Sequence, residues 1–383
     1  MTNSIEVRPF HIDIPQVDLD DLRDRLARTR WTEELPDAGT DAGTDYGVTV
    51  DYVRRLANHW LHDYDWRAWE AKLNAHPQFT TEIDGQNVHF LHIRSTEPNA
   101  FPLILTHGWP GSVVEYLDVI GPLTDPRAHG LDPAQAFDLV IPSVPGFGFS
   151  GPTKERGWTV QRVARAWAEL MRRLGYERYG AVGNDGGSLI SPEVGRVDPS
   201  HVAGVHVTQI FSFPGGDPAE FEGMTEDELA AMAHLQWFHE NLGAFGQVQG
   251  QQPQTLAHAL ADSPAGLIGW NGQLFGDAVD IEFALTNLAI YWFTGTSASS
   301  ARFYYENAHM DAPTEPTTVP IGLAAFAGDF KSIRRFVDRD HKNVVSWREY
   351  DTGGHYAAHQ APDVLVADIR GFFGDLLADR VDT

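Results

Sequence analysis

The stretch from 179 to 187 reads Tyr-Gly-Ala-Val-Gly-Asn-Asp-Gly-Gly, and it decides which fold the chain can take. Its first part, 179–182, predicts a buried strand, and a helical pattern follows the glycines. Small residues at 183, 186 and 187 would allow a very sharp strand-to-helix turn, which pushes its central side chain out at the end of the sheet. That side chain is Asp185. A carboxylate is ionised at neutral pH, so it could attack carbon without a general base and leave an ester. An Asx turn or a helix cap is the other interpretation of Asp185.

The sequence on both sides of this turn alternates between strand and helix patterns. A helix is expected over 159–174, where Thr159 can cap its start and Gly175 its end, and another begins at Pro362. Short apolar runs predict strands at 103–106, 137–141, 179–182, 201–208, 321–327 and 344–350. This alternation favours an α/β protein with a mainly parallel sheet that helices cover on both faces.

The remaining segments suggest four parts in the chain. An N-terminal extension over 1–95 carries helical patterns at 17–30 and 52–73, a hairpin around Asp84-Gly85, and a loop-like echo of Asp-Ala-Gly-Thr at 37–44. The tryptophans at 60, 66 and 69 are interpreted as a packing surface rather than a binding platform. The core then occupies 96–210 and 317–383, and a helical, aromatic-rich lid is inserted over 211–316.

Composition excludes several classes of function. The 383 residues include no cysteine, which rules out a disulfide framework, a thiol nucleophile and a cysteine-ligated metal. The formal net charge of −25 at pH 7 repels phosphate backbones and anionic lipid surfaces, so we expect no nucleic-acid or membrane partner. No apolar run approaches the ~18 residues that span a bilayer. The first residues lack the regions of a signal peptide, so a cytoplasmic location is expected.

A glycine-rich turn follows the first strand of the core and reads His-Gly-Trp-Pro-Gly-Ser at 107–112. Such a turn exposes backbone N–H groups, although alone it is also typical of a tight loop with no catalytic role. Together with the N–H of the residue after a nucleophile, one of them would form an oxyanion hole. The candidate donors are therefore Trp109 and Gly186.

Two further side chains follow late strands of the core. His355, in Gly-Gly-His-Tyr at 353–356, is placed for general-base work, and Asp329 could orient it and stabilise its charged form. With seventeen histidines in the chain, one chosen at random would be structural. The chain order Asp185, Asp329, His355 is, however, the nucleophile, acid and base order of α/β-hydrolases. The combined pattern predicts that fold with an aspartate nucleophile.

The lid separates two chemistries for such a nucleophile. Opening an epoxide needs an acid for the departing oxygen, and Tyr304 or Tyr305, within 302–307, offers a phenol. Releasing a halide needs N–H donors, often an indole beside the nucleophile, and Gly186 occupies that position. This argues against a dehalogenase. Ordinary helix packing is the alternative role of the two tyrosines.

At this point the chain resembles the microsomal and juvenile-hormone type of epoxide hydrolase over nearly its whole length. The motifs that carry the resemblance lie at 7–10, 107–112, 145–150, 302–307 and 353–358. The resemblance implies an N-terminal domain that wraps core and lid, Tyr304 as the acid, His355 as the base and Asp329 as the acidic triad member. It also implies the soluble bacterial branch, because the membrane anchor is absent. Some members of that branch serve antibiotic biosynthesis, including enediyne pathways.

Two departures from the family pattern stand out. The family elbow usually reads Gly-Gly-Asp-Trp-Gly, whereas Asn184 and Gly186 replace its second glycine and its tryptophan. The missing indole is expected to widen the pocket beside the nucleophile. The family also uses two lid tyrosines, and Phe245 stands where the second is expected. Either Tyr304 acts alone or another donor helps, and the candidates for that donor are Gln236, Trp237 and Tyr305.

The resulting hypothesis is an epoxide hydrolase that forms an ester on Asp185 and releases a vicinal diol. The substrate is expected to be a small apolar or aromatic epoxide, with no metal or organic cofactor. Two alternatives stay open: a haloalkane-type dehalogenase, and a non-catalytic binding protein that kept the pocket. The oligomeric state stays open between a monomer and a homodimer.

Overall fold

The computed structural model describes residues 6–35, 46–311 and 313–378. The Asp-Ala-Gly-Thr echo at 37–44 lies outside these residues. Every helix within them is too short or too polar to cross a bilayer.

Nine strands of the described residues form one sheet, whose order is β1-β2-β3-β5-β4-β6-β7-β8-β9. The strands β4 to β9 run parallel to one another, whereas β1, β2 and β3 pair antiparallel at one edge, where β3 joins β5. This confirms the mainly parallel sheet expected from the sequence. The strands are β1 (Arg8–Phe10), β2 (Gln78–Ile83), β3 (Gln86–Ile93), β4 (Phe101–Thr106), β5 (Phe137–Pro142), β6 (Tyr179–Gly183), β7 (Val202–Val207), β8 (Ile321–Gly328) and β9 (Val344–Gly354).

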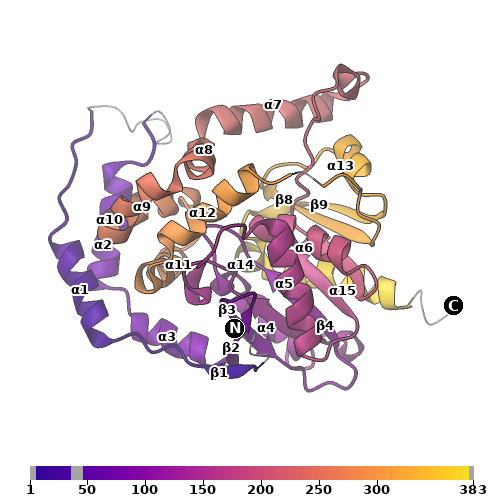
Figure 1. Cartoon of the computed structure of the whole chain (residues 1–383), viewed down its shortest axis with the longest axis horizontal. Helices are drawn as coiled ribbons and strands as arrows, with labels where there is room; N and C mark the ends of the chain where they lie inside the picture. Colours follow the sequence, from indigo (N-terminus) through magenta and orange to yellow (C-terminus); the bar gives the residue numbers. More distant parts are fainter. Residues whose placement is uncertain (1–5, 36–45, 312, 379–383) are drawn as a thin grey trace.

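Helices cover both faces of this sheet (Figure 1). Neighbouring residues of β7 show the two faces, because successive side chains of a strand point in opposite directions. Val205 meets α6, where a Cβ on Gly195 would lie 3.2 Å from it, and Gly204 faces the Phe372 ring of α15. The helices of the core are α4 (Leu117–Thr124), α5 (Val160–Arg173), α6 (Gly186–Val197), α13 (Arg334–Asp340), α14 (Ala357–Gln360) and α15 (Pro362–Ala378).

The amphipathic helix expected at 159–174 is α5. The Thr159 side chain accepts a hydrogen bond from the Arg162 N–H, as an N-cap does, and Gly175 follows the helix with a φ of +84°. Its apolar stripe, which includes Val163 and Trp167, is buried against the core.

The insertion after β7 is helical, as expected. It consists of α7 (Glu226–Asn241), α8 (Ala244–Gln251), α9 (Pro253–Asp262), α10 (Pro264–Asn271), α11 (Ile281–Thr294) and α12 (Ser297–Ala308). Helix α12 packs against α8 and α9, whereas α7 extends along the outer side of the lid (Figure 1).

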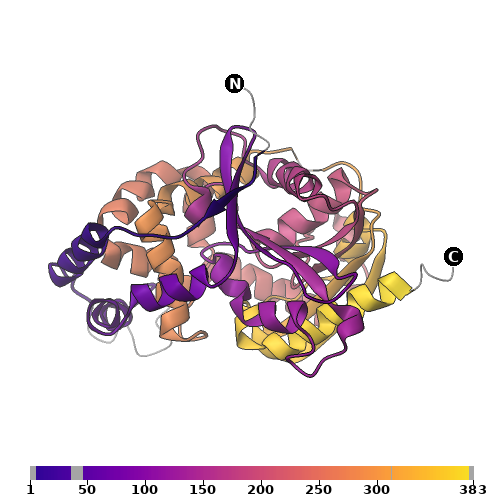
Figure 2. The ribbon, with the colours of Figure 1, turned by 90° about the horizontal axis from the view of Figure 1, so that it is seen from below.

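The N-terminal segment contacts both the sheet and the lid. After β1, which lies at the edge of the sheet, helix α1 (Gln16–Ala27) and helix α2 (Val50–His62) pack on α10, and α2 and α3 (Trp66–Asn74) pack on α11. Figure 2 shows these helices beside the lid at one end of the molecule. Trp60 and Trp66 are buried, and the Trp66 ring lies 5.0 Å from that of Phe293. These tryptophans are therefore packing residues, as the sequence indicated.

One helix expected from the sequence is divided into two helices in the structure. The pattern at 52–73 predicts a continuous helix, but α2 ends at His62 and α3 begins at Trp66. The reason is local: the Asp65 side chain accepts the N–H groups of Arg67 and Ala68, which caps a new helix and stops the old one.

Candidate active site

The turn between β6 and α6 is sharp, and its glycines make this possible. Asp185 has φ +51° and ψ −119°, a backbone conformation that residues with side chains rarely adopt and that is concentrated at functional sites. The glycines allow close approach: a Cβ on Gly187 would lie 1.8 Å from the Thr106 carbonyl oxygen. A Cβ on Gly183 would lie 2.0 Å from the Gly187 oxygen. The turn therefore holds Asp185 in a strained geometry at the carboxyl end of the sheet, rather than as a simple helix cap.

The Asp185 carboxylate lies between a backbone donor and an imidazole. Its Oδ1 accepts a hydrogen bond of 2.8 Å from the Trp109 N–H, and its Oδ2 lies 3.6 Å from His355 Nε2. The N–H of Gly186, at the first position of α6, makes no hydrogen bond to any part of the chain that the structure describes. Of the two candidate oxyanion donors, the Trp109 N–H is therefore engaged with the carboxylate, and the Gly186 N–H has no partner among the described residues.

The imidazole of His355 connects the two carboxylates. Its Nδ1 lies 3.2 Å from Asp329, on the side opposite to Asp185. Burial alone would lower the pKa of His355, but the charges of Asp329 and then Asp185 raise this pKa to about 10. Burial alone would likewise raise the pKa of Asp329, yet the neighbouring His355 holds it below its usual range. The structure therefore brings the three predicted residues into one ion-paired array.

A cluster of three aromatic rings lies beside Asp185. Phe245 of α8 stacks on Trp109 at 5.6 Å, and Tyr304 of α12 meets both rings edge-on, at 5.7 Å and 6.0 Å. Burial and the charge of Asp185 raise the pKa of Tyr304 above its ordinary value, so the phenol stays a hydrogen-bond donor. Tyr304 and Phe245 thus lie together. They are the two residues that the sequence analysis matched to the two lid tyrosines of the family pattern, the second of which is a phenylalanine here.

Three other predicted pocket residues do not join the site. Gln236 and Trp237 lie on α7, a helix with no buried residue; Trp237 is 46% exposed and stacks on His234. Tyr305 follows Tyr304 on the same helix, and consecutive helical residues point about 100° apart, so the two rings face different directions. The Tyr305 ring is 39% exposed and stacks on His309. These side chains do not supply the second donor that the sequence analysis sought.

The surroundings of Gly186 are defined by the oxyanion loop and by Phe303. A Cβ on Gly186 would lie 3.4 Å from the Gly108 Cα and 3.7 Å from the Phe303 ring, which is ordinary contact. A small side chain would therefore fit here, and the wider pocket expected from the missing indole stays a prediction.

Two buried polar residues near the elbow were missed by sequence reasoning. Glu115 follows the oxyanion loop and accepts a hydrogen bond of 2.7 Å from Asn184, and burial raises its pKa to about 8. Gln209, two residues after β7, donates to Asp329 and accepts from the Asp185 N–H. The available signal was position: Glu115 interrupts an apolar run, and Gln209 follows the carboxyl end of a parallel strand.

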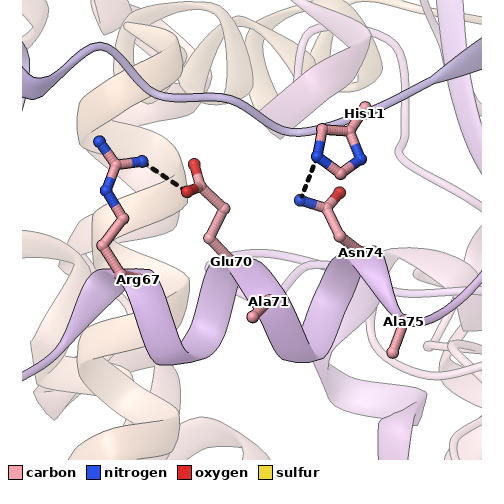
Figure 3. A pocket seen from close by; sticks show the side chains of 6 residues that line it. All are labelled: His11, Arg67, Glu70, Ala71, Asn74 and Ala75. Atoms are coloured by element: carbon pink, nitrogen blue, oxygen red, sulfur yellow. Dashed lines mark hydrogen bonds and ion pairs between the residues drawn. The ribbon is translucent and has the colours of Figure 1, made fainter.

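A separate hollow of about 400 Å³ lies on the N-terminal segment (Figure 3). Its polar side chains pair with one another, Arg67 with Glu70 and Asn74 with His11. It contains none of the predicted site residues. Among residues 6–35, 46–311 and 313–378, no group of three or more His, Asp or Glu side chains is arranged to hold a metal ion.

Gly108 lies so close to Asp185 that a side chain at this position would collide with the carboxylate. A Cβ on Gly108 would lie 2.0 Å from Asp185 Oδ1, so Gly108→Ala must displace the carboxylate. A displacement of about 1 Å costs on the order of 10²-fold in rate, and we expect at least that loss of turnover with styrene oxide. Gly246→Ala is the control, because an added methyl there meets no atom within 4 Å. Full activity of a folded Gly108→Ala variant would contradict this arrangement.

Two protein-family models match this chain. A family model described as the epoxide hydrolase N terminus matches residues 7–116, and one described as the alpha/beta hydrolase fold matches residues 102–319. The chain is 39% identical to a Stigmatella aurantiaca protein with a provisional epoxide hydrolase name, over 97% of this chain and 86% of the relative. It is 32% identical to Epoxide hydrolase 1 of Sus scrofa, over 96% of this chain and 88% of the relative.

A solved structure has the same architecture. The epoxide hydrolase of Aspergillus niger superposes with a TM-score of 0.85 at 28% identity, over 98% of each chain. The likeness therefore extends over the N-terminal segment, the core and the lid alike.

Proposed function

Because the chain belongs to the epoxide hydrolase family and has the α/β-hydrolase fold, we propose that it opens an epoxide through Asp185 and releases a vicinal diol. The observation that carries this proposal is the position of Asp185. Its carboxylate lies at a strained elbow, between the Trp109 N–H and His355, with the partly buried phenol of Tyr304 nearby.

In the first step, an oxygen of Asp185 attacks an epoxide carbon in line with the C–O bond that breaks. A new C–O ester bond forms, and the departing ring oxygen takes up a proton. Tyr304 is the donor in this proposal, since its raised pKa keeps the proton on the phenol until the alkoxide develops. Phe245 beside it cannot donate, so Tyr304 carries this role without a second phenol.

In the second step, His355 takes a proton from water, and the water oxygen attacks the ester carbonyl. The N–H groups of Trp109 and Gly186 then hold the oxyanion. When the ester C–O bond breaks, the departing oxygen takes up the proton of the new carboxyl group, so the Asp185 carboxylate is restored and the diol leaves. A pKa of about 10 means that His355 is protonated at rest. Ester formation removes the negative charge 3.6 Å from Nε2 and so lowers the pKa of His355. The imidazolium proton then passes through solvent to the Tyr304 phenolate that ring opening leaves, and the neutral imidazole becomes the base for water.

The substrate class follows from the rings that surround the carboxylate. Trp109, Phe245 and Tyr304 present flat apolar surfaces within contact of one another. We therefore propose a small apolar or aromatic epoxide as substrate.

We also propose that the four expected parts of the chain have separate functions in this reaction. The halves at 96–210 and 317–383 carry Asp185, Asp329 and His355, and the lid at 211–316 carries Tyr304. The segment 1–95 supports the lid, in agreement with the packing of α1, α2 and α3 on α10 and α11.

Isotope labelling during a single turnover tests this function. With enzyme in excess over styrene oxide in heavy-oxygen water, the label should enter the Asp185 carboxylate, because water attacks the ester carbonyl. The diol of this turnover should carry an unlabelled oxygen from Asp185, and a second addition of epoxide to the same enzyme should release labelled diol. Mass spectrometry of the diol and of the Asp185 peptide makes the measurement. Label that enters the first diol directly would show attack by water on the epoxide and would contradict the ester.

A further inference from the structure

A buried polar cluster lies beneath the elbow. It consists of Glu115, Asn184 and Gln209, which are 1%, 3% and 0% exposed. Burying an amide or carboxyl group costs free energy unless the group is hydrogen-bonded, so the arrangement of these bonds is informative. None of the three is part of the proposed reaction steps.

Gln209 uses its whole hydrogen-bonding capacity in this cluster. Its Oε1 accepts from the Asp185 N–H at 2.8 Å and from Ser188 Oγ at 2.9 Å. Its Nε2 donates to Asn184 Oδ1 at 2.7 Å and to Asp329 Oδ2. The backbone N–H of Asp185 can only donate, so the amide oxygen must face it and the amide N–H groups must face Asp329.

The Asp329 carboxylate has few other partners. Among the described residues, it receives the imidazole of His355, the backbone N–H of Phe330 at 2.8 Å and the amide of Gln209. Gln209 is the side chain that opposes His355 on this carboxylate. The rotation of the carboxylate about its own bond therefore depends on Gln209.

Gln209 is hydrogen-bonded to Asn184, which is hydrogen-bonded in turn to Glu115. Asn184 Oδ1 accepts from Gln209 and from Thr208 Oγ1, at 2.7 Å and 2.6 Å, and its Nδ2 donates to Glu115 Oε1. A continuous chain of buried hydrogen bonds thus runs from Glu115, next to the oxyanion loop, to the acidic member of the triad.

We propose that Gln209 is a positioning residue for hydrolysis of the ester, because one amide holds Asp329 against His355 and also fixes the backbone that carries Asp185. This inference rests on the proposed function. Attack by Asp185 on the epoxide needs the nucleophile and Tyr304, whereas hydrolysis needs an oriented His355 whose developing charge is supported by Asp329. Loss of the amide donor must therefore slow the second step more than the first.

The variant Gln209→Met keeps the length of the side chain and removes the donor and the acceptor. Rapid mixing with styrene oxide, acid quenching and intact-protein mass spectrometry give the fraction of protein that carries the ester at steady state. We expect kcat to fall about 10- to 100-fold, the range for a hydrogen bond to a charged group, and the ester to accumulate. A residue that only supports the fold would lower both steps together and leave the ester fraction unchanged.

Thr208→Val is the matched control. It removes another bond to Asn184 Oδ1 from the same buried cluster but leaves Gln209 and Asp329 paired. Its ester fraction should equal that of the wild type, even where its melting temperature falls.

Gln209→Glu is the second variant, in case the methionine variant does not fold. It keeps the acceptor for the Asp185 N–H, and its carboxyl group either repels Asp329 or draws the charge of Asp329 into a shared proton. The ester should again accumulate. A folded variant with wild-type kcat and no ester overturns the inference, provided that His355→Gln traps the ester. If His355→Gln also yields no ester, the proposed function itself has failed.

Discussion

The variant His355→Gln should become heavier by the mass of one whole epoxide when it is mixed with styrene oxide. Asp185 can still open the ring, because its attack needs no base. The ester then persists, since no imidazole lies 3.6 Å from the carboxylate to activate water. Turnover should fall about 10²- to 10⁴-fold, the usual contribution of a positioned general base. Intact-protein mass spectrometry of the quenched mixture measures the adduct directly.

The double variant His355→Gln with Asp185→Asn is the control, and it should gain no mass. A mass gain that persists in the double variant would place the nucleophile elsewhere. No adduct from several epoxides on folded His355→Gln protein would contradict the ester mechanism. An adduct from alkyl halides alone would favour the dehalogenase, and tight binding with no adduct from either class would favour a binding protein.

Replacing Tyr304 with phenylalanine is expected to reduce the rate of ring opening about 10²- to 10³-fold, as loss of a donor to a developing oxyanion commonly does. The effect should be large because Phe245, on the neighbouring helix, offers no second phenol. Pre-steady-state measurement of ester formation with styrene oxide separates this step from hydrolysis. The ester should form slowly and should not accumulate.

Two further substitutions serve as controls for this experiment. Tyr305→Phe alters the next residue of the helix, whose ring stacks on His309, and it should leave the rate unchanged. Phe245→Tyr adds a phenol beside Tyr304, so the Tyr304→Phe variant should regain part of its rate when this change is added. Ester formation at the wild-type rate in Tyr304→Phe would assign the acid to another group.

The arrangement of Asp185, Asp329 and His355 could be predicted because its signals are local. Asp185 lies within a run of glycines whose only compact solution is a sharp turn, and His355 and Asp329 each follow a strand of a parallel sheet. Strands of such a sheet end at the same edge, so the chain order was enough to bring the three side chains together. The amphipathic stripe and cap residue of α5 are equally local.

The roles of Gln209 and Glu115 could not be predicted in the same way. Both residue types are common at surfaces, and their burial beneath the elbow depends on which strands become neighbours. Gln236 and Trp237 were misplaced for a related reason. An aromatic residue in a lid can line a pocket or stay exposed, and only the packing of α7 shows that Trp237 stays exposed. Likewise, the break between α2 and α3 depends on the cap that a single aspartate, Asp65, provides within an otherwise continuous helical pattern.

The N-terminal segment has a consequence for engineering. It provides the edge strands β1 to β3, and its helices support the lid through α10 and α11. A chimera that takes its lid from one relative must therefore take this segment from the same parent. Chimeras that separate the two should melt in two transitions rather than one, because the joint between their parents would cross the surface that makes lid and sheet a single cooperative unit.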